Sequence, residues 1–364
     1  MKILLVAPVP PPYGGIANWV LLMEEYFKDN RENELVGIID ISPKKRGLDG
    51  RTLWDRIVKQ GFEMFKLNSK LKQMIQDKNP NILHMTTSGQ FAIIRDILFL
   101  YTAKIKKIPT LYHIRFGRIP EIEKKNTLEW KLLKKAIKLS NKVITIDEKT
   151  YQVLNKHFCN NKIEKIANPF NLNKITLIKN KNPSKVIMFL GWCIKEKGIE
   201  ELLLAWEEIN RDYPEWNLKL VGPINDNYKM ELLKKFSMKQ VILEGEKEHD
   251  VALELLNNSS IFILPSYTEG FPNSILEAMA LEKPIIATDV GAIAEMLEQD
   301  GGIIIPPKDK NAIKESLIKL LDDKVLRELY GNNAKERLVN NYSIEVIVKK
   351  YNFVWREIQS NENL

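Results

Sequence analysis

The chain has 364 residues, of which 44% are hydrophobic and 28% are charged, which is typical of a soluble globular protein. This length is too great for a single ordinary core and predicts two domains. No apolar run approaches the roughly 18 residues that a membrane-spanning helix needs. Two isolated cysteines, Cys159 and Cys193, indicate neither a disulfide framework nor a metal site, so we expect a cytoplasmic protein.

The net charge of +8 is unevenly distributed along the chain. Residues 1–180 contain 32 Lys and Arg against 17 Asp and Glu, a balance of +15, whereas residues 181–364 contain 23 against 30, a balance of −7. The basic half predicts an anionic partner, and a solvated lysine-rich surface is the alternative. No recognised nucleic-acid module is visible, so we expect no nucleic-acid partner.

Apolar runs of strand length alternate with amphipathic segments through the first half. The first run is followed by a Pro/Gly loop rather than a cleavage site, so we interpret it as a buried strand and not as a signal peptide. The predicted strands are 2–7, 35–40, 81–85, 110–113, 142–146 and 162–166, and the predicted helices include 16–29, 52–76, 91–107 and 127–139. This alternation indicates a parallel sheet covered on both faces.

The alternation is interrupted at 168–184 and then restarts. The second series has predicted strands at 185–190, 217–221, 240–243, 261–264, 284–287 and 303–305, with helices at 199–211, 227–237, 251–256, 274–280, 292–297 and 311–321. A last helix is expected at 345–358. Two such series predict an α/β protein with two Rossmann-like domains.

Ligands of open parallel sheets bind beyond the carboxyl ends of the strands, so the loops there are candidate sites. After the first strand, Gly14 and Gly15 precede a helix, where backbone N–H groups can approach an anion. The loop has neither the dinucleotide fingerprint nor a Walker spacing. On spacing alone, an ordinary strand-to-helix turn is the favoured interpretation.

The strongest local pattern is EGFPNSILEAMA at 269–280, which follows an apolar strand and opens a helix. The helix N-terminus is expected to direct its free N–H groups at a phosphate. Glu269 and Glu277 are expected to face one cleft, where carboxylates can accept hydrogen bonds from sugar hydroxyls. Two alternatives remain: Ser274 and Glu277 have the spacing of a capping box, and the alternative role of Glu269 is to stabilise the helix start.

This segment resembles the E-x7-E signature of the retaining GT-B glycosyltransferases of family 4, also called glycosyl transferases group 1. Other landmarks occur in the same order, namely the Gly14-Gly15 loop, His113 at a strand end, Asn168-Pro169, and GWCIKEKG at 191–198, which is similar to G-R-x-x-x-E-K-G. The resemblance covers essentially the whole chain. It implies domains at 1–170 and 171–342 whose parallel sheets face each other across a cleft, with a C-terminal helix at 343–360 that packs back on the first domain.

The resemblance also implies roles for individual residues. Glu277 would hold the ribose hydroxyls, Glu269 the donor sugar, and Lys197 the diphosphate. The implied catalytic residues are Glu269, His113 and Lys197, and the implied donor-binding residues are Gly14, Gly15, Lys197, Glu269, Gly270, Phe271, Asn273, Ser274, Ile275 and Glu277. A surface lysine at a helix start is the alternative for Lys197, and a hydrogen-bonded strand-end histidine is the alternative for His113.

The chain departs from the family pattern at Trp192, where the family has an arginine that grips the diphosphate. Indole carries no charge, so another cation is expected to substitute, with Arg115 and Arg118 as candidates. No Asp-x-Asp motif occurs, and the four histidines lack ligand spacing, so we expect a metal-independent enzyme without a cofactor.

The implied function is retaining transfer of a hexose from a nucleotide diphosphate sugar, UDP-sugar being favoured, to a glycan or lipid-diphosphate-linked acceptor in cell-envelope polysaccharide synthesis. Basic amphipathic segments at 51–72 and 130–138 favour peripheral contact with the inner face of an anionic membrane, and ordinary packed helices are the alternative. The rival functions are a sugar-nucleotide 2-epimerase of the same architecture and a non-catalytic sugar-nucleotide-binding protein.

Overall fold

The computed structural model describes the chain except for residues 12–14, 30–31, 43–52, 159–160, 176–182 and 361–364, and it leaves undescribed the side chains of residues 29, 53–60 and 174. The described chain divides into two compact units. Unit 1 consists of residues 1–168 and 347–364, and unit 2 of residues 169–346. The division lies close to the sequence-predicted boundaries at 170 and 343.

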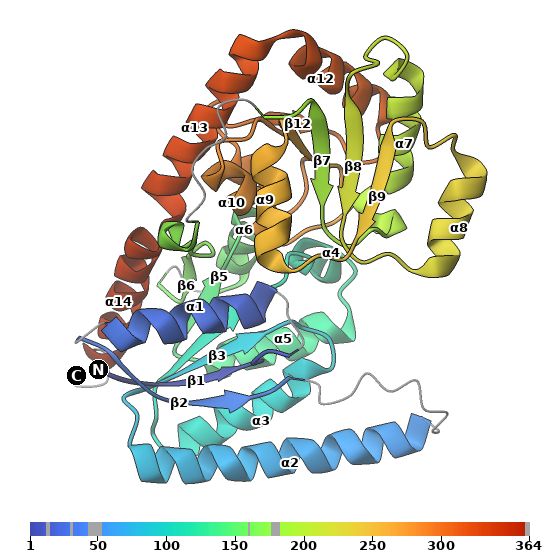
Figure 1. Ribbon diagram of the computed structural model, residues 1–364. Coiled ribbons are helices and arrows are strands. Elements are labelled where there is room, and N and C mark those ends of the chain that lie inside the picture. Colours follow the sequence, from blue (N-terminus) through green and yellow to red (C-terminus); the bar gives the residue numbers. More distant parts are fainter. Residues whose placement is uncertain (12–14, 30–31, 43–52, 159–160, 176–182, 361–364) are drawn as a thin grey trace. The chain divides into compact units, whose positions relative to one another are not determined.

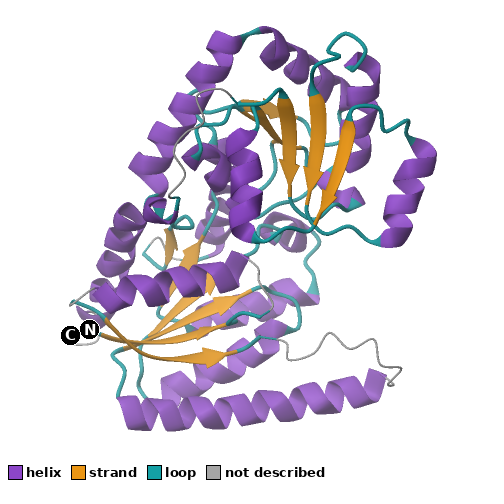
Figure 2. Ribbon diagram, viewed as in Figure 1, coloured by secondary structure: helices purple, strands orange, loops and turns teal. Residues whose placement is uncertain are grey.

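Unit 1 is built on a six-stranded parallel sheet with the strand order β2-β1-β3-β4-β5-β6. Its strands are β1 (Lys2–Ala7), β2 (Glu34–Asp40), β3 (Ile82–Thr87), β4 (Thr110–Ile114), β5 (Lys142–Thr145) and β6 (Ile163–Lys165). Its helices are α1 (Gly15–Asp29), α2 (Leu53–Lys78), α3 (Ala92–Ile105), α4 (Ile119–Lys124), α5 (Leu128–Leu139) and α6 (Glu148–His157), together with most of α14 (Ile344–Ser360). The sheet has helices on both faces (Figures 1 and 2).

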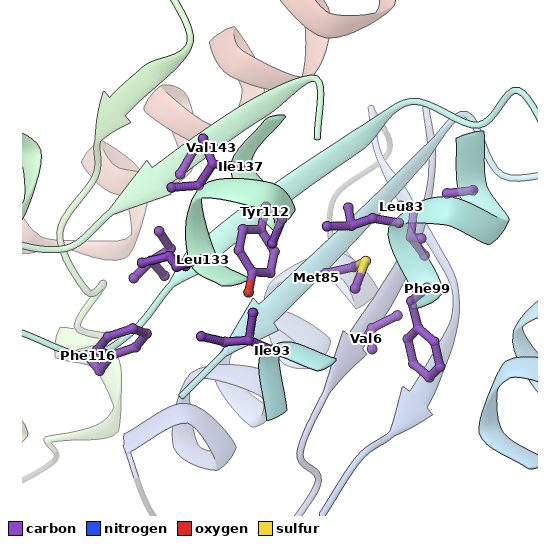
Figure 3. Packing of buried hydrophobic residues seen from close by; sticks show 14 of the residues in the cluster. Val6, Leu83, Met85, Ile93, Phe99, Tyr112, Phe116, Leu133, Ile137 and Val143 are labelled. Carbon is purple, nitrogen blue, oxygen red and sulfur yellow. The ribbon is translucent and has the colours of Figure 1, made fainter. Parts of the chain in front are cut away.

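Side chains alternate across this sheet because successive residues of a strand point to opposite faces. Leu83 and Met85 of β3 and Tyr112 of β4 pack with Phe99 of α3 and Leu133 of α5 (Figure 3). The intervening His84 and His113 lie on the other face, among side chains of α1 and α14. The continuous apolar runs of the strands are therefore buried on both faces of the sheet, and the cluster around Tyr112 fills one of them.

Unit 2 has a second six-stranded parallel sheet with the order β12-β11-β10-β7-β8-β9. Its strands are β7 (Val186–Leu190), β8 (Asn217–Val221), β9 (Val241–Gly245), β10 (Ile261–Leu264), β11 (Ile285–Thr288) and β12 (Ile303–Ile305). Its helices are η1 (Leu172–Lys174), η2 (Lys195–Lys197), α7 (Ile199–Ile209), α8 (Asp226–Lys235), α9 (His249–Asn258), α10 (Asn273–Ala280), α11 (Ile293–Met296), α12 (Lys310–Asp322) and α13 (Lys324–Tyr342). The predicted α/β class with two Rossmann-like domains is confirmed.

Each sheet has a point at which the direction of strand addition reverses, between β1 and β3 in unit 1 and between β7 and β10 in unit 2. In open α/β sheets, ligands bind beyond the carboxyl ends of the strands at such a point. In unit 2, the loops that follow β7 and β10 contain Lys197 and Glu269, respectively. The topology therefore brings these two predicted site residues to one place.

Candidate functional site

Lys197 and Glu269 form an ion pair at the switch point of unit 2. The Nζ atom of Lys197 lies 2.5 Å from Oε1 of Glu269, and both side chains are largely buried. The same carboxylate oxygen accepts a 2.7 Å hydrogen bond from the Oγ atom of Ser266, whose carbonyl oxygen accepts a bond from Thr288 at the end of β11. The loops after β7 and β10 therefore converge on one carboxylate, and the end of β11 holds Ser266 in place. An ammonium group has three donors, so Lys197 keeps donors for a further anion.

Two glycines fix the backbone around this pair. Gly198 has a φ of +70°, and a Cβ atom there would lie 2.1 Å from the carbonyl oxygen of Pro265. Gly291 has a φ of +57°, and its Cβ atom would lie 2.4 Å from the carbonyl oxygen of Glu269. Only glycine accommodates both this conformation and this close approach. The positions of Lys197 and Glu269 therefore depend on these glycines.

Glu277 lies inside α10 and is 9% exposed. Its Oε1 atom lies 3.0 Å from Nε2 of His249, which is the first residue of α9. The capping-box interpretation is wrong because the N-cap position is Pro272, so that Ser274 already lies within the helix. Glu277 is thus bound to a neighbouring helix and does not close its own helix.

The N-terminus of α10 offers backbone donors beside Glu269. No side chain caps the helix at its N-cap, Pro272, and the N–H group of Ile275 makes only a 3.2 Å bond back to the carbonyl of Pro272. Within the described residues, the N–H groups of Asn273 and Ser274 have no hydrogen-bond acceptor, and both residues are half-buried. Such groups, together with the helix dipole, favour a phosphate oxygen.

Two further residues of the predicted donor site, Gly270 and Phe271, make contacts within unit 2. Phe271 is buried, and its ring packs edge-to-face on Tyr342 of α13 with centroids 5.5 Å apart. The carbonyl oxygen of Gly270 accepts a 2.9 Å hydrogen bond from the N–H group of Ala292. The ring of Phe271 is therefore part of the core of unit 2. We expect only the backbone of Phe271 to be available for the predicted contact with a donor.

The glycine loop of unit 1 is only partly covered by the structure. Gly14 lies outside the described residues. Gly15 is the first residue of α1 and is exposed, and a Cβ atom there would meet no other atom within 4 Å. Packing therefore gives no reason for a glycine at position 15, in contrast to Gly198.

His113 is fully buried in unit 1. Its Nδ1 atom lies 3.2 Å from Nε2 of His84, and its Nε2 atom lies 3.5 Å from the guanidinium of Arg115. The ring of Trp19 packs edge-on against both imidazoles. Burial and the adjacent Arg115 lower the pKa of His84 to about 3 and that of His113 well below its ordinary value. The structure thus agrees with a hydrogen-bonded strand-end histidine, and a contact of His113 with a sugar stays a prediction.

Arg115 and Arg118, the two candidates to replace the family's diphosphate-binding arginine, both have partners already. Arg115 donates a 2.7 Å hydrogen bond to Oδ1 of Asn168, and Arg118 forms a 2.5 Å ion pair with Glu129. Trp192 is 54% exposed in the loop after β7. Lys308 follows β12 at the same edge of the sheet, and its Nζ atom lies 4.9 Å from the ring centroid of Tyr267 in the Glu269 loop. Lys308 is therefore an additional cation that contacts the loop carrying Glu269.

His249 and Lys308 are residues that the sequence did not indicate. His249 and Glu277 are 28 positions apart in the sequence, and no rule of sequence spacing predicts a contact between them. Both residues follow the carboxyl end of a strand, which is the one signal that would have selected them. Within the described residues, no group of three His, Cys, Asp or Glu side chains is placed to hold a metal ion. The expectation of a metal-independent enzyme stays a prediction.

The fold and the site geometry describe a protein of two Rossmann-like units with a candidate ligand site at the switch point of the second. Residues 173–337 match the family of glycosyl transferases group 1. The chain is 32% identical over 186 residues to the capsular polysaccharide biosynthesis glycosyltransferase CapM of Staphylococcus aureus, which covers 50% of this chain and 47% of that protein. It is 31% identical over 225 residues to an uncharacterized glycosyltransferase of Haemophilus influenzae, which covers 59% and 61%. Each match spans less than two thirds of the relative.

Solved structures agree with this assignment at the level of the fold. The structure of HepE from Anabaena in complex with UDP superposes with a TM-score of 0.74 at 17% sequence identity, covering 98% of this chain and 100% of that one. The same protein in complex with UDP-glucose gives a TM-score of 0.72 at 17% identity, covering 98% and 100%. Residues 173–337 therefore resemble the glycosyl transferases group 1 family, and the chain as a whole has the GT-B fold.

Proposed function

We propose that the chain is a retaining glycosyltransferase that moves a hexose from a UDP-sugar to a glycan or lipid-diphosphate-linked acceptor in cell-envelope polysaccharide synthesis. The observation that carries the proposal is the Lys197–Glu269 pair at the switch point of unit 2, beside the uncapped N-terminus of α10. A carboxylate for sugar hydroxyls and a cation with helix N–H groups for a diphosphate match the two ends of a nucleotide-sugar donor.

In this proposal, Lys197 and the N–H groups of Asn273 and Ser274 stabilise the charge that develops on the departing diphosphate. Glu269 exchanges part of its bonding to Lys197 for hydroxyls of the donor sugar. Glu277 holds the ribose hydroxyls, and His249 fixes the carboxylate of Glu277 at 3.0 Å. These steps assign no chemistry to His113, which is buried and hydrogen-bonded to His84, and its contact with the donor sugar stays a prediction.

The proposed reaction retains the anomeric configuration by attack on the front face. The acceptor oxygen forms the new bond to the anomeric carbon while the bond to the diphosphate breaks, and the departing diphosphate takes the acceptor's proton. The resemblance to family 4 supports this route. The enzyme then acts by holding geometry and charge and needs no covalent sugar intermediate.

The capsular relative supports the proposed pathway, since its name places it in capsular polysaccharide biosynthesis. The HepE complexes with UDP and UDP-glucose support a uridine donor. The basic balance of residues 1–180 supports a phosphorylated or lipid-linked acceptor held by unit 1.

A thermal-shift panel of UDP, GDP, ADP and their sugar conjugates, with and without EDTA, tests the donor. A ligand at 100 times its dissociation constant stabilises by about 2.7 kcal/mol, so the true donor class stands out. We expect UDP compounds to raise the melting temperature in EDTA, and Glu277→Gln to abolish the shift. Glu254→Gln is the matched control, because it removes an exposed carboxylate from α9.

Product analysis then separates the transferase from its rivals. A transferase releases UDP and forms a glycosidic bond whose configuration NMR reports as retained. An epimerase interconverts two UDP-sugars without an acceptor, and a non-catalytic binding protein leaves the donor intact. Either of these last two results, with donor binding demonstrated, would overturn the proposed activity.

A further inference from the structure

Helix α3 of unit 1 is apolar on the face that it turns to solvent. Phe91, just before the helix, is 84% exposed, and Ile105 at its end is 75% exposed, with Ile94 and Tyr101 about half exposed between them. These positions are separated by three, seven and four residues, which are close to whole helical turns, and so they share one side of the helix. The opposite side is buried as well as apolar, with Phe99 at its centre. Helices that cover a sheet normally carry charged residues on their outward face, whereas the exposed side of α3 is mainly apolar, with Lys104 as an exposed charge in its last turn.

A pocket of about 610 Å³ adjoins the C-terminal end of this helix. Four lysines line it: Lys104 and Lys107 from the end of α3, Lys138 from α5, and Lys162 just before β6. Among the described residues, no carboxylate forms an ion pair with Lys104, Lys107 or Lys138, all of which are exposed. Within the part of the chain that the structure describes, the charges of Lys104, Lys107 and Lys138 are therefore uncompensated by ion pairs.

The pocket lies at the edge of the sheet where strands begin. Thr110, the first residue of β4, and Asn141, just before β5, contribute to its wall. The Gly15 loop follows the carboxyl end of β1, at the opposite edge of the same parallel sheet. The lysine pocket is thus separate from the loops in which the sequence predicts donor contacts.

We propose that the outward face of α3 and the lysine pocket together bind an anionic phospholipid membrane. The ammonium groups of Lys104, Lys107 and Lys138 bind the phosphate of a lipid head group, and the exposed side chains of Ile94 and Ile105 enter the acyl region. A lipid is the occupant that supplies a phosphate and an apolar tail side by side. The inference concerns a surface of unit 1 and does not depend on the proposed transferase activity.

This surface differs from the sequence expectation in its location. Of the two basic segments predicted to contact a membrane, the segment 130–138 contributes Lys138 to the pocket. In the segment 51–72, only residues 61–72 have described side chains, and Phe62 and Phe65 of α2 are exposed there. The sequence predicts a helix at 91–107 but does not indicate that one side of it is apolar and exposed. Within the described residues, no helix is both long enough and apolar enough to cross a bilayer, so contact is peripheral.

Vesicle flotation of the full chain tests the proposal. The vesicles contain phosphatidylcholine alone or phosphatidylcholine with phosphatidylglycerol, at 0.1 M and 0.5 M salt. We expect flotation only with phosphatidylglycerol, and weaker flotation at high salt because screening acts on the lysines. The variant Lys104→Gln/Lys107→Gln/Lys138→Gln should bind about a hundredfold more weakly, roughly fivefold for each lysine. The variant Ile94→Ser/Ile105→Ser should lose binding at both salt concentrations.

The matched control is Lys229→Gln/Lys234→Gln/Lys239→Gln, which removes three exposed lysines from unit 2 and should float as the wild type does. All substituted side chains are on the surface, and unchanged circular dichroism and melting temperature verify folding. The proposal is wrong if the wild type stays at the bottom with phosphatidylglycerol, or if the pocket variant floats like the control. It is also wrong if inorganic phosphate stabilises the protein through these lysines without flotation, or if Ile94→Ser/Ile105→Ser abolishes self-association instead.

Discussion

The ammonium nitrogen of Lys197 lies 2.5 Å from Oε1 of Glu269, although the two residues are 72 positions apart in the sequence. One side chain follows β7 and the other follows β10, so the reversal of strand order between these neighbours creates the contact. The pair is a charge-assisted hydrogen bond in a largely buried setting. Its two members are therefore expected to depend on each other for position as well as for charge.

Lys197→Met is the first prediction. Removal of a preorganised donor from a developing anion typically lowers kcat by about 10² to 10³, and we expect a loss of this size. Arginine cannot restore full activity, since a planar guanidinium does not reproduce the position of an ammonium group. Steady-state kinetics, with the donor that the thermal-shift panel selects, measures the effect on kcat. Lys195→Met, two positions earlier in the same turn and exposed, is the control and should keep nearly full activity.

The His249–Glu277 contact leads to the second prediction. Glu277→Gln should weaken UDP binding by at least about tenfold, because the charged acceptor of the ribose hydroxyls is lost. His249→Ala should weaken binding less, since it removes only the group that orients the carboxylate. Calorimetric titration with UDP gives both dissociation constants. Equal losses for both variants, or a greater loss for His249→Ala, would contradict the assigned roles.

A pair of glycine substitutions is the third prediction. Gly198→Ala should destabilise the protein by about 2–4 kcal/mol, because alanine is strained at a φ of +70° and its Cβ atom would meet Pro265. Gly15→Ala should leave the melting temperature unchanged or slightly raised, since the position is open and helical. Its donor affinity should nevertheless fall, because a methyl group blocks the close approach of a diphosphate. Unaltered affinity in Gly15→Ala would remove Gly15 from the site.

The strands were predictable because their sequences are continuous apolar runs bounded by polar loops. Four of the twelve strands, including β1 and β10, have the predicted bounds, and the others differ by a few residues at their ends. Helices α4, α6 and α13 were not predicted. Helix α13 has a mostly polar sequence over Lys324–Tyr342 with few buried positions, so its periodicity is weak. Helix α4 is six residues long, which is too short for a period to appear.

The residues of the candidate site could be predicted from the sequence, but the contacts between them could not. The sequence indicated Lys197, Glu269 and Glu277 through the family pattern, but the hydrogen bonds that fix them join distant residues. The contact of His249 with Glu277 and the burial of His113 depend on how helices pack over each sheet. Sequence periodicity predicts that α3 is a helix, but it does not show that Ile94 and Ile105 are exposed.

The buried histidine pair gives the fourth prediction, which concerns pH. Burial and Arg115 lower the pKa of His84 to about 3 in the folded protein, whereas an unfolded histidine titrates near 6.5. Above pH 6.5 both states are neutral at His84. As the pH falls from 6.5 toward 3, His84 binds a proton in the unfolded chain but not in the folded chain. The free energy of unfolding therefore decreases. His84 alone should remove about 2 kcal/mol at pH 5, and His113 acts in the same direction.

Urea unfolding at pH 7 and pH 5, followed by tryptophan fluorescence, measures this loss, because Trp19 packs against both imidazoles. His84→Gln should be less stable than the wild type at pH 7 but should show a smaller drop between the two pH values. The exposed His157 supplies the control, and His157→Gln should keep the drop of the wild type. A drop that is the same in His84→Gln and in the wild type would mean that other groups cause the acid sensitivity, and that the buried pair is protonated in the folded protein.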